Sequence, residues 1–343
     1  MQRAHENRFE WLTPGDPGVW PSEDAHTRAP SAAEMARCRL VQLVALALLL
    51  HVRPAASVDV NAEIDYEPLR SKIRALLESP PQAPCRYPEG AIMVTYANAH
   101  MFRLTVLQRR ALEINRMREC VERRLVTVCL DARCLELCEE DGIPNCVDLK
   151  IATTPSNFRT ADYYWITYVK HEILEAAAQV ATEAFFFDTD TLIFDDPWSV
   201  NLTAPAGPYD LRYQHESSPD EVCAGGVNGG QLYVRSSNAT AAYFAAMRAF
   251  KPQILDGTKG LDQDYIFHAA DAANLTRCGL DSAYFIGHCG GSRIPTSDSK
   301  KIVVYHVNCA GGDTKWGLLS HFYKVRAAEK ELNIDVAVSQ ADG

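Results

Sequence analysis

The sequence lacks a dense block of lysine and arginine. Its 343 residues include 34 Lys and Arg against 44 Asp and Glu, so the net charge is −10 at pH 7. A protein that neutralises nucleic-acid phosphates needs a basic patch or stripe. The composition therefore argues against a nucleic-acid partner. An anionic substrate would need a cation or a local basic group to bind to so acidic a chain.

Internal repeats and low-complexity segments are absent, and only one long apolar run is present. It covers Leu40 to Leu50, with two arginines just before it and a small-residue Ala-Ala-Ser after it. A free-standing transmembrane helix needs about 17–25 apolar residues, so this run is short for one. The order basic, apolar, small is typical of a secretory signal peptide, which we expect over residues 35–57.

Two alternatives to a cleaved signal stay open. In one, residues 40–52 are an uncleaved membrane anchor, and in the other they are a buried hydrophobic helix. Residues 1–34 precede the predicted signal, although a signal peptide normally starts the chain. They are polar and show no periodicity, which indicates a disordered or mis-called extension with Met35 as the biological start.

Paired Cys-x-x-Cys motifs are absent, although the chain has 11 cysteines. One of them, Cys38, lies in the predicted signal, and the other ten suit disulfides in an oxidising compartment. The cluster at 129, 134, 138 and 146 lacks the paired spacing of a zinc site, so we expect disulfides there rather than zinc. Sequons at Asn201, Asn238 and Asn274 agree with a secretory route. We expect the protein in the Golgi lumen, with secretion as the alternative.

Apolar runs alternate with segments of helical periodicity through the middle of the chain. Buried strands are expected at 91–98, 125–131, 142–149 and 185–187, and helices at 101–121, 133–140 and 160–181. This alternation predicts an α/β domain whose mostly parallel sheet carries helices on both faces. Beyond Asp190 the pattern is less regular, with strands expected at 225–237 and 301–308 and helices at 239–250 and 261–270.

The segments before and after this domain lack the alternation of strands and helices. Residues 66–77 suit a short helix, and the proline-rich stretch that follows breaks it, so residues 58–90 are predicted to be a stem or linker. We expect one catalytic domain over 91–325 and a C-terminal tail over 326–343.

An acidic pair follows the most aromatic of the expected strands. Phe185 to Phe187 lead directly into Asp188-Thr189-Asp190. In open α/β sheets, ligands bind at the carboxyl ends of the strands. Two carboxylates at i and i+2 can share a hard divalent cation such as Mg²⁺ or Mn²⁺, so the motif predicts a metal that holds a diphosphate. The alternative is a solvated acidic turn.

Three further segments carry residues suited to chemistry. Asn228 precedes a glycine pair and could bond a sugar hydroxyl, unless the segment is an ordinary glycine loop. Asp262-Gln263-Asp264 could stabilise positive charge on a reacting sugar, or Asp262 could simply cap a helix. His306 ends an apolar strand and suits Mn²⁺ as a ligand, unless its role is structural. Lys315 follows it and could neutralise a leaving diphosphate.

Taken together, six ordered blocks resemble the nucleotide-diphospho-sugar transferases, retaining glycosyltransferases of the GT-A fold. The blocks are VTYANAHM (94–101), YYWITYVKHEIL (163–174), FFFDTDTLIFDDPW (185–198), VNGGQLYVR (227–235), GLDQDYIF (260–267) and YHVNCAGGDTKW (305–316). They look most like the plant and algal type that includes arabinosyl-, xylosyl- and galactosyltransferases. The gap between His306 and the glycines is wider than in the family's His-x-x-Gly-x-x-Lys pattern.

The resemblance implies a metal-dependent transferase that moves a hexose or pentose from a UDP-sugar to a hydroxyl of a glycan or glycoprotein, with retention of configuration. It implies Mn²⁺ or Mg²⁺ held by Asp188, Asp190 and His306. The residues it assigns to the nucleotide-sugar are Thr95, Tyr96, Asn98, Lys170, Asp188, Asn228 and Lys315. Asp262, Gln263 and Asp264 become the catalytic group, with Asp262 or Asp264 as a base or transient nucleophile.

Two other classes of function remain as alternatives. A haloacid-dehalogenase-like phosphatase also places Asp-x-Asp after an apolar strand and would use Asp188 and Asp190. Its fifth motif position is normally Thr or Val, whereas here it is Leu192. The second alternative is an inactive secreted protein that binds a carbohydrate or nucleotide-sugar without turnover.

Overall fold

The computed structural model describes residues 63–80, 85–151, 160–200, 202, 208–216, 223, 225–257, 260–288 and 301–330. The predicted extension over 1–34, the signal or anchor over 35–57, the sequon at Asn201 and most of the C-terminal tail lie outside these ranges. Within them, no helix is both long and apolar enough to span a bilayer. The asparagines of the other two sequons, Asn238 and Asn274, are exposed.

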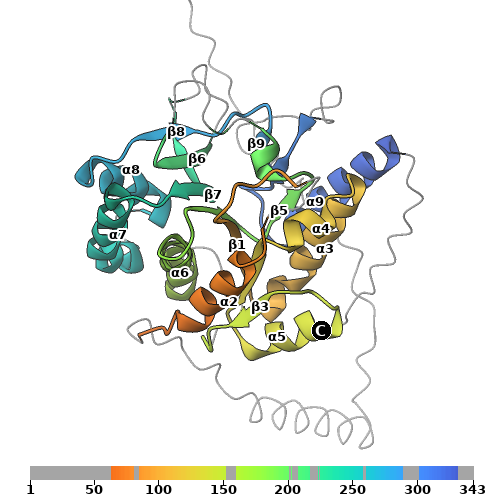
Figure 1. The fold of residues 1–343 in the computed structure, drawn as a ribbon, viewed down its shortest axis with the longest axis horizontal. Helices are drawn as coiled ribbons and strands as arrows, with labels where there is room; N and C mark the ends of the chain where they lie inside the picture. Colours follow the sequence, from red (N-terminus) through yellow and green to blue (C-terminus); the bar gives the residue numbers. More distant parts are fainter. Residues whose placement is uncertain are drawn as a thin grey trace, which may run out of the picture. The chain divides into compact units, whose positions relative to one another are not determined.

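A seven-stranded sheet forms the centre of the molecule (Figure 1). Four strands run parallel in the order β3 (Cys146–Asp148), β2 (Leu125–Cys129), β1 (Ala91–Ala97) and β4 (Glu183–Phe187). The sheet continues with β7 (Val227–Arg235), β6 (Leu211–His215) and β8 (Arg277–Gly279). The strand β7 is antiparallel to both its neighbours, and β8 is parallel to β6.

A second, three-stranded sheet continues directly from the end of β4. Its order is β5 (Thr191–Ile193), β10 (Val304–His306) and β9 (Phe285–Gly287). The pair β5 and β10 is antiparallel, and β10 runs parallel to β9. This small sheet brings the C-terminal part of the chain to the carboxyl end of β4.

Helices cover both faces of the central sheet. One face packs against α2 (Glu67–Leu77), α6 (Ala161–Ala178), α7 (Asn238–Asp256) and α8 (Asp262–Ala272). The other face carries α3 (Phe102–Ile114), α4 (Arg118–Glu122) and the small sheet, with α9 (Gly312–Glu329) behind it. Another helix, α5 (Ala132–Glu140), packs beside β2 and β3. The predicted α/β class, with a mostly parallel sheet between helices, is confirmed.

Successive side chains of the aromatic strand β4 point to opposite faces of the central sheet. Phe186 packs 5.5 Å from Tyr96 in the core under α6. Phe185 and Phe187 stack at 4.4 Å on the opposite face. Because both faces are apolar, the strand reads as an uninterrupted aromatic run rather than as an alternating pattern.

Several element boundaries differ from the sequence prediction. The helix expected over 101–121 is divided into a 3₁₀ turn (Ala99–Met101), α3 and α4. Asn115 ends α3 because its side-chain amide donates to the Phe194 carbonyl at 2.8 Å, and Arg116 then takes a positive φ of 58°. The helix α7 runs past Pro252 to Asp256, six residues beyond the predicted end at Phe250.

Part of the segment predicted as a stem contributes to the core. It forms α2, whose Leu69 and Ile73 are fully buried against the central sheet and α6. Likewise, Arg326 and Ala327 in the predicted tail are buried within α9.

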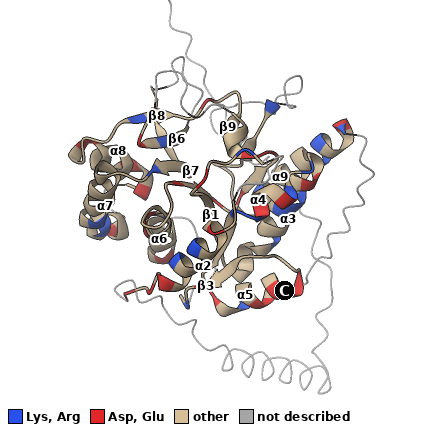
Figure 2. Cartoon of the chain, viewed as in Figure 1, with Lys and Arg blue, Asp and Glu red and all other residues tan. Residues whose placement is uncertain are grey.

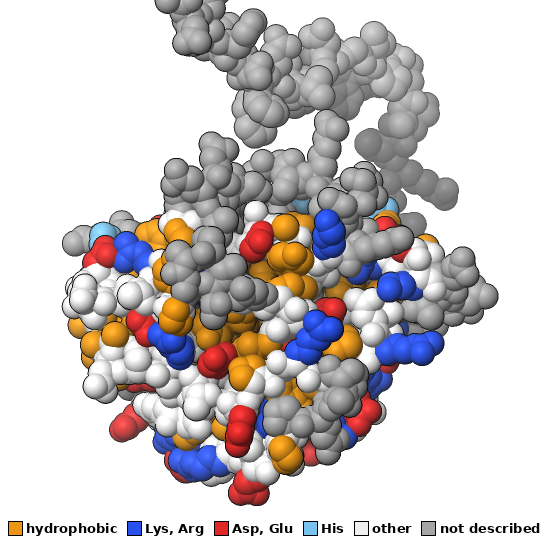
Figure 3. Space-filling model, turned by 45° about the horizontal axis from the view of Figure 1, so that its top comes forward, with side chains coloured by type: hydrophobic (Ala, Val, Ile, Leu, Met, Phe, Trp, Pro, Cys, Tyr) orange, Lys and Arg blue, Asp and Glu red, His pale blue; other side chains and the backbone are white. Residues whose placement is uncertain are grey.

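The charged side chains of the described elements are mixed in sign. Lys and Arg and also Asp and Glu are scattered over the helices (Figure 2). On the face in Figure 3, apolar side chains lie between charged groups of both signs.

Candidate active site

The acidic pair and His306 meet where the two sheets join. The strand β4 ends at Phe187, so Asp188 and Asp190 leave the carboxyl edge of the central sheet. The next strand, β5, pairs with β10 so that Thr191 lies opposite His306. The Val307 amide donates to the Asp190 carbonyl at 3.1 Å, which fixes the acidic turn to β10.

Asp188, Asp190 and His306 form a group that can hold a metal ion. Their ligating atoms all lie within 4.8 Å of one another. The His306 Nε2 atom is 3.3 Å from Asp190 Oδ1 and 4.0 Å from Asp188 Oδ2. Two carboxylates and an imidazole suit Mn²⁺, with Mg²⁺ a weaker match because of the nitrogen. The buried Asp188 Oδ1 atom accepts no hydrogen bond from the described residues, as expected of an oxygen kept for a cation.

A glutamine that the sequence reasoning missed orients the imidazole. Gln214 lies on β6, and its Oε1 atom is 2.7 Å from His306 Nδ1. A carbonyl oxygen can only accept, so Nδ1 carries the proton and Nε2 keeps its lone pair toward the carboxylates. Metal-binding histidines are commonly held by such a hydrogen bond. Nothing in the sequence pointed to Gln214, because no strand was predicted over Leu211–His215.

The glycine pair makes room for the site's own side chains. A Cβ atom on Gly230 would lie 2.1 Å from His306 Cε1, and one on Gly229 would lie 3.1 Å from Lys170 Nζ. The pair belongs to β7 rather than to a loop. The backbone at Gly229 and Gly230 is therefore approached closely by the side chains of Lys170 and His306.

Lys315 reaches the site from the first turns of α9. Its Nζ atom is 2.5 Å from Asp190 Oδ2. Burial raises the pKa of the Asp190 carboxyl, but Lys315 and His306 outweigh burial and hold that pKa well below its ordinary value. At Asp188, burial raises the pKa more than the neighbouring Lys170 lowers it. The wider spacing after His306 thus does not keep Lys315 from the acidic pair.

A second buried charge cluster adjoins the first. Lys170 and His171 are consecutive on α6, and both contact Asp262 Oδ2, at 3.2 and 2.9 Å respectively. Lys170 Nζ is also 3.8 Å from Asp188 Oδ2, so it links the two clusters. Burial raises the pKa of Asp262, but Lys170 and His171 bring it below its ordinary value, which keeps the carboxylate ionised. Asp262 is therefore no helix cap, and His171 is a second residue that the sequence reasoning missed.

Two of the predicted catalytic residues behave differently from Asp262. The Cβ atom of Gln263 lies 3.7 Å from the position of a Cβ on Gly229, so this residue borders the cluster. Asp264 is exposed, and its Oδ2 atom accepts the Leu261 amide at 2.7 Å. The Asp264 side chain therefore lies away from the cluster around Asp262, because positions two apart on a helix point to different faces.

Of the residues predicted to bind the nucleotide-sugar, some lie near the acidic residues and others bond elsewhere in the protein. Tyr96 is buried, and burial together with Asp188, Asp262 and Asp190 raises its pKa, which shows that it faces both acidic clusters. Asn98 instead accepts the Met101 amide at 3.0 Å and caps the 3₁₀ turn. Asn228 donates to Glu216 at 2.6 Å and accepts from the Gly230 amide at 2.9 Å, so its amide already has protein partners. Thr95 is fully buried within the sheet.

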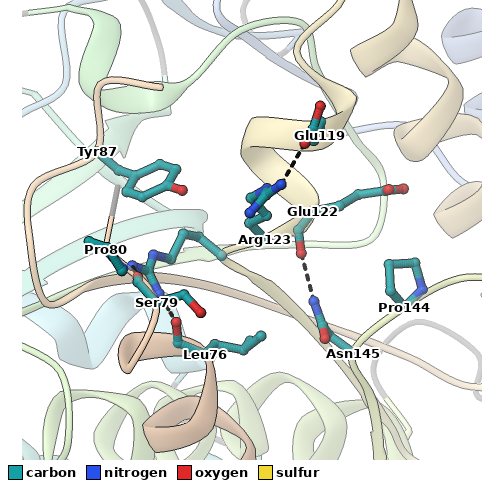
Figure 4. Close-up of a pocket in the computed structure, with 10 residues that line it drawn as sticks. Leu76, Ser79, Pro80, Tyr87, Glu119, Glu122, Arg123, Pro144 and Asn145 are labelled. Carbon is teal, nitrogen blue, oxygen red and sulfur yellow. Dashed lines mark hydrogen bonds and ion pairs between the residues drawn. The ribbon is translucent and has the colours of Figure 1, made fainter. Parts of the chain in front are cut away.

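A separate cavity lies at the opposite, amino-terminal edge of the sheet (Figure 4). Its volume is about 360 Å³, and its lining includes Tyr87, Glu119, Arg123 and Arg124. Arg124 precedes β2, and its guanidinium donates to the carbonyls of Leu76 and Ser79. None of the predicted site residues reaches this cavity.

Comparisons with known proteins place the chain in a family. The family model described as nucleotide-diphospho-sugar transferase matches residues 120–319. No curated protein matches by sequence.

Solved structures similar to the chain include three glycosyltransferases. A structure of galactosyltransferase LgtC with donor and acceptor sugar analogs is 15% identical, with a TM-score of 0.43, over 71% of this chain and 96% of that one. Glycosyltransferase GlyE of Streptococcus pneumoniae is 12% identical, with a TM-score of 0.43, over 70% and 62%. Mouse xyloside xylosyltransferase 1 is 13% identical, with a TM-score of 0.40, over 64% and 98%.

The matched residues cover more than half of the chain and include Asp188, Asp190, Asp262, His306 and Lys315. The match also decides against the phosphatase alternative, since it assigns the Asp-x-Asp segment to a different family. The mostly parallel central sheet with helices on both faces agrees with the predicted GT-A fold. The chain belongs to the nucleotide-diphospho-sugar transferase family and is a glycosyltransferase of the GT-A fold.

Proposed function

We propose that the protein transfers a hexose or pentose from a UDP-sugar to a hydroxyl group of a glycan or glycoprotein, with retention of configuration and with Mn²⁺ or Mg²⁺. The observation that carries this proposal is the meeting of Asp188, Asp190 and His306, with their ligating atoms within 4.8 Å. Lys315 beside them adds a fixed cation at the same point. A site with this donor set suits a metal-bound diphosphate.

Asp188, Asp190 and His306 would hold the cation, which acts as a Lewis acid toward the leaving diphosphate when bound. Gln214 keeps the lone pair of His306 Nε2 available, because its Oε1 atom accepts a hydrogen bond from the Nδ1–H group of His306. Lys315 and Lys170 supply two further positive charges near the carboxylates, and both are largely buried. Such charges stabilise a leaving diphosphate more strongly than they would in water.

Asp262 would act on the sugar. It is ionised, 2% exposed and held between Lys170 and His171. Transfer of a glycosyl group develops positive charge at the anomeric carbon, and a fixed carboxylate lowers the energy of that state. The same carboxylate would serve as a base or transient nucleophile if transfer passes through a covalent intermediate, and as a charge stabiliser alone if it passes through a same-face internal return. Gln263 borders this position and would contact the sugar.

The proposed compartment is the Golgi lumen. The described part of the chain contains disulfides between Cys85 and Cys120, between Cys138 and Cys146, and between Cys223 and Cys278. Disulfides persist in oxidising compartments and are rare in the cytosol. They support the secretory route that the signal-like segment suggests.

UDP release tests this proposal. The purified chain is incubated with UDP-galactose, UDP-arabinofuranose, UDP-xylose or UDP-glucose, with and without Mn²⁺. We expect release from one donor that requires the metal and is lost in Asp190→Ala but kept in Asp141→Ala, which removes an exposed carboxylate on the C-terminal side of α5. UDP binding without release from any donor would instead support the inactive binding protein.

A further inference from the structure

Four cysteines meet at the carboxyl end of β2, outside the candidate active site. Cys129 ends β2, Cys134 and Cys138 lie on α5, and Cys146 begins β3. Cys138 and Cys146 are joined in a disulfide. Cys129 Sγ lies 3.7 Å from Cys138 Sγ and only 2.7 Å from Cys134 Sγ. Both Cys129 and Cys134 are fully buried.

The distance between these two sulfurs is too short for two separate thiols. Non-bonded heavy atoms of this size come to rest about 3.5–4.0 Å apart. A disulfide bond is about 2.05 Å long. The sulfurs of Cys129 and Cys134 thus lie closer to bonding distance than to contact distance. The buried surroundings leave them facing each other.

The state of the other cysteines points the same way. Cys85, Cys120, Cys138, Cys146, Cys223, Cys278 and Cys309 are all disulfide-bonded, so Cys129 and Cys134 are the two free thiols of the described residues. A chain that forms these bonds folds in an oxidising compartment. Before the chain has folded, these two thiols are exposed to the oxidants of that compartment. We therefore expect them to be oxidised before they are buried.

We propose that Cys129 and Cys134 form a further disulfide, which lies directly beside Cys138–Cys146. The two thiols lose two protons and two electrons, and a disulfide oxidant, such as oxidised glutathione or a protein disulfide of the lumen, is reduced to two thiols. The Cys129 thiol and burial both raise the pKa of Cys134, so the folded pair holds little of the reactive thiolate. The bond therefore forms as the chain folds, before α5 closes over it.

This bond would brace the turn that supports the end of β1. Between the two cysteines, Asp131 accepts the Cys134 amide at 2.7 Å and the Ala99 amide at 3.0 Å. The Leu130 amide also donates to the Ala97 carbonyl at 2.8 Å. The disulfide thus fixes the segment that holds the carboxyl end of β1, next to the candidate active site. The proposal does not depend on the transferase activity.

Zinc is the competing occupant of the cluster, because four thiolates can bind it in tetrahedral geometry. Zinc would require the Cys138–Cys146 bond to be open. The two states differ in the number of free thiols after denaturation, so they can be separated by chemical labelling.

Peptide mapping of the full chain tests the proposal. The protein, expressed through a secretory route, is denatured with iodoacetamide and no reductant, and is then digested with trypsin. Cleavage after Arg124, Arg133 and Lys150 puts Cys129 in peptide 125–133 and Cys134 in peptide 134–150. We expect the two peptides to stay linked and to separate on reduction. In Cys138→Ala/Cys146→Ala the link should remain, which shows that Cys129 pairs with Cys134.

Two results would overturn the proposal. One is two separate peptides, each alkylated once, in which Cys129 and Cys134 carry the label and Cys138 and Cys146 do not. The other is one zinc ion per chain with all four cysteines labelled. In the unmodified chain, a second digestion of the linked peptides after Glu136 and Glu140 separates Cys134 from Cys138 and Cys146, so a variant that fails to fold does not block the test.

Discussion

At the residue scale, the position of His306 depends on the absence of one side chain. A Cβ atom on Gly230 would lie 2.1 Å from the imidazole, so Gly230→Ala must push His306 away from Asp190. We expect the variant to weaken Mn²⁺ binding at least about 10-fold, since losses of this size follow when a ligand is displaced. Titration calorimetry with Mn²⁺ in the presence of UDP measures it.

Gly317→Ala is the matched control, because nothing lies within 4 Å of a Cβ on this residue of α9. Alanine in a helix interior should leave metal binding unchanged and raise stability by about 0.5–1 kcal/mol. Equal Mn²⁺ affinity in Gly230→Ala and the unmodified chain would show that His306 is not a ligand.

Gln214 offers a test of the imidazole's orientation. Gln214→Leu removes the acceptor for His306 Nδ1, and the ring is then free to turn or to change tautomer. We expect Mn²⁺ affinity to fall about 10–100-fold. Gln214→Glu keeps an acceptor oxygen at the same place and should retain binding. Comparable losses in both variants would indicate that the site responds to packing at Gln214 and not to its hydrogen bond.

The sequence allowed the ligands to be predicted, but not the residues that position them. Asp188 and Asp190 stand out because two carboxylates follow an apolar strand, and His306 because it ends another. Gln214 and His171 carry no such mark, since a buried polar residue is recognised only by the partner it meets, and both partners lie at least 91 positions away in the chain. The partners of Asn98 and Asn228 could not be predicted either: Asn98 accepts the Met101 amide, and Asn228 bonds to Glu216 and to the Gly230 amide.

At the scale of elements, Asp262 joins α8 to α6. The contacts to Lys170 and His171 are buried, so Asp262→Asn leaves a buried ammonium short of one counter-charge. Removing one partner of a buried pair costs about 3–5 kcal/mol of the free energy of unfolding. Urea denaturation at pH 7 measures this difference.

The loss of unfolding free energy in Asp262→Asn should also depend on pH. The pKa of Asp262 is lowered in the folded state, and its unfolded value is about 3.9. The contribution to stability is therefore complete above about pH 5 and is lost as the pH falls below 3.9 toward the folded pKa. We expect the gap between the unmodified chain and Asp262→Asn to narrow in acid. Asp141→Asn, at an exposed carboxylate, is the control variant measured in parallel.

The predicted boundaries of helices and strands agree with the structure where the apolar pattern is long. They differ from it where a contact with a distant part of the chain ends the element. The strands β1, β2 and β4 lie within or beside their predicted ranges. The helix predicted over 101–121 is broken by the bond from Asn115 to the Phe194 carbonyl, a contact across 79 positions. The short strand β5 went unrecognised because its three residues form a strand only by pairing with β10.

At the scale of the whole molecule, the α/β class could be predicted because strand and helix alternate up to β4. Strands were also predicted where β7 and β10 lie, but the antiparallel pairing of β7 with β4 and β6 and the formation of the small sheet could not be predicted, since this pairing joins segments separated by long connections. It is this second half of the topology that brings His306 and Lys315 to Asp190. The site is thus assembled only in the folded chain, and its ligands should stabilise that state.

A ligand that binds only the folded chain raises the unfolding free energy by about 2.7 kcal/mol at 100 times its dissociation constant. For a domain of this size, this corresponds to a rise of several degrees in Tm. We expect Mn²⁺ with UDP to produce such a rise by differential scanning fluorimetry, and EDTA to reverse it. Each variant is compared with its own metal-free Tm, because Asp190→Ala also removes the partner of Lys315. The rise should vanish in Asp190→Ala and persist in Asp141→Ala, and a rise of equal size in both would place the cation elsewhere in the protein.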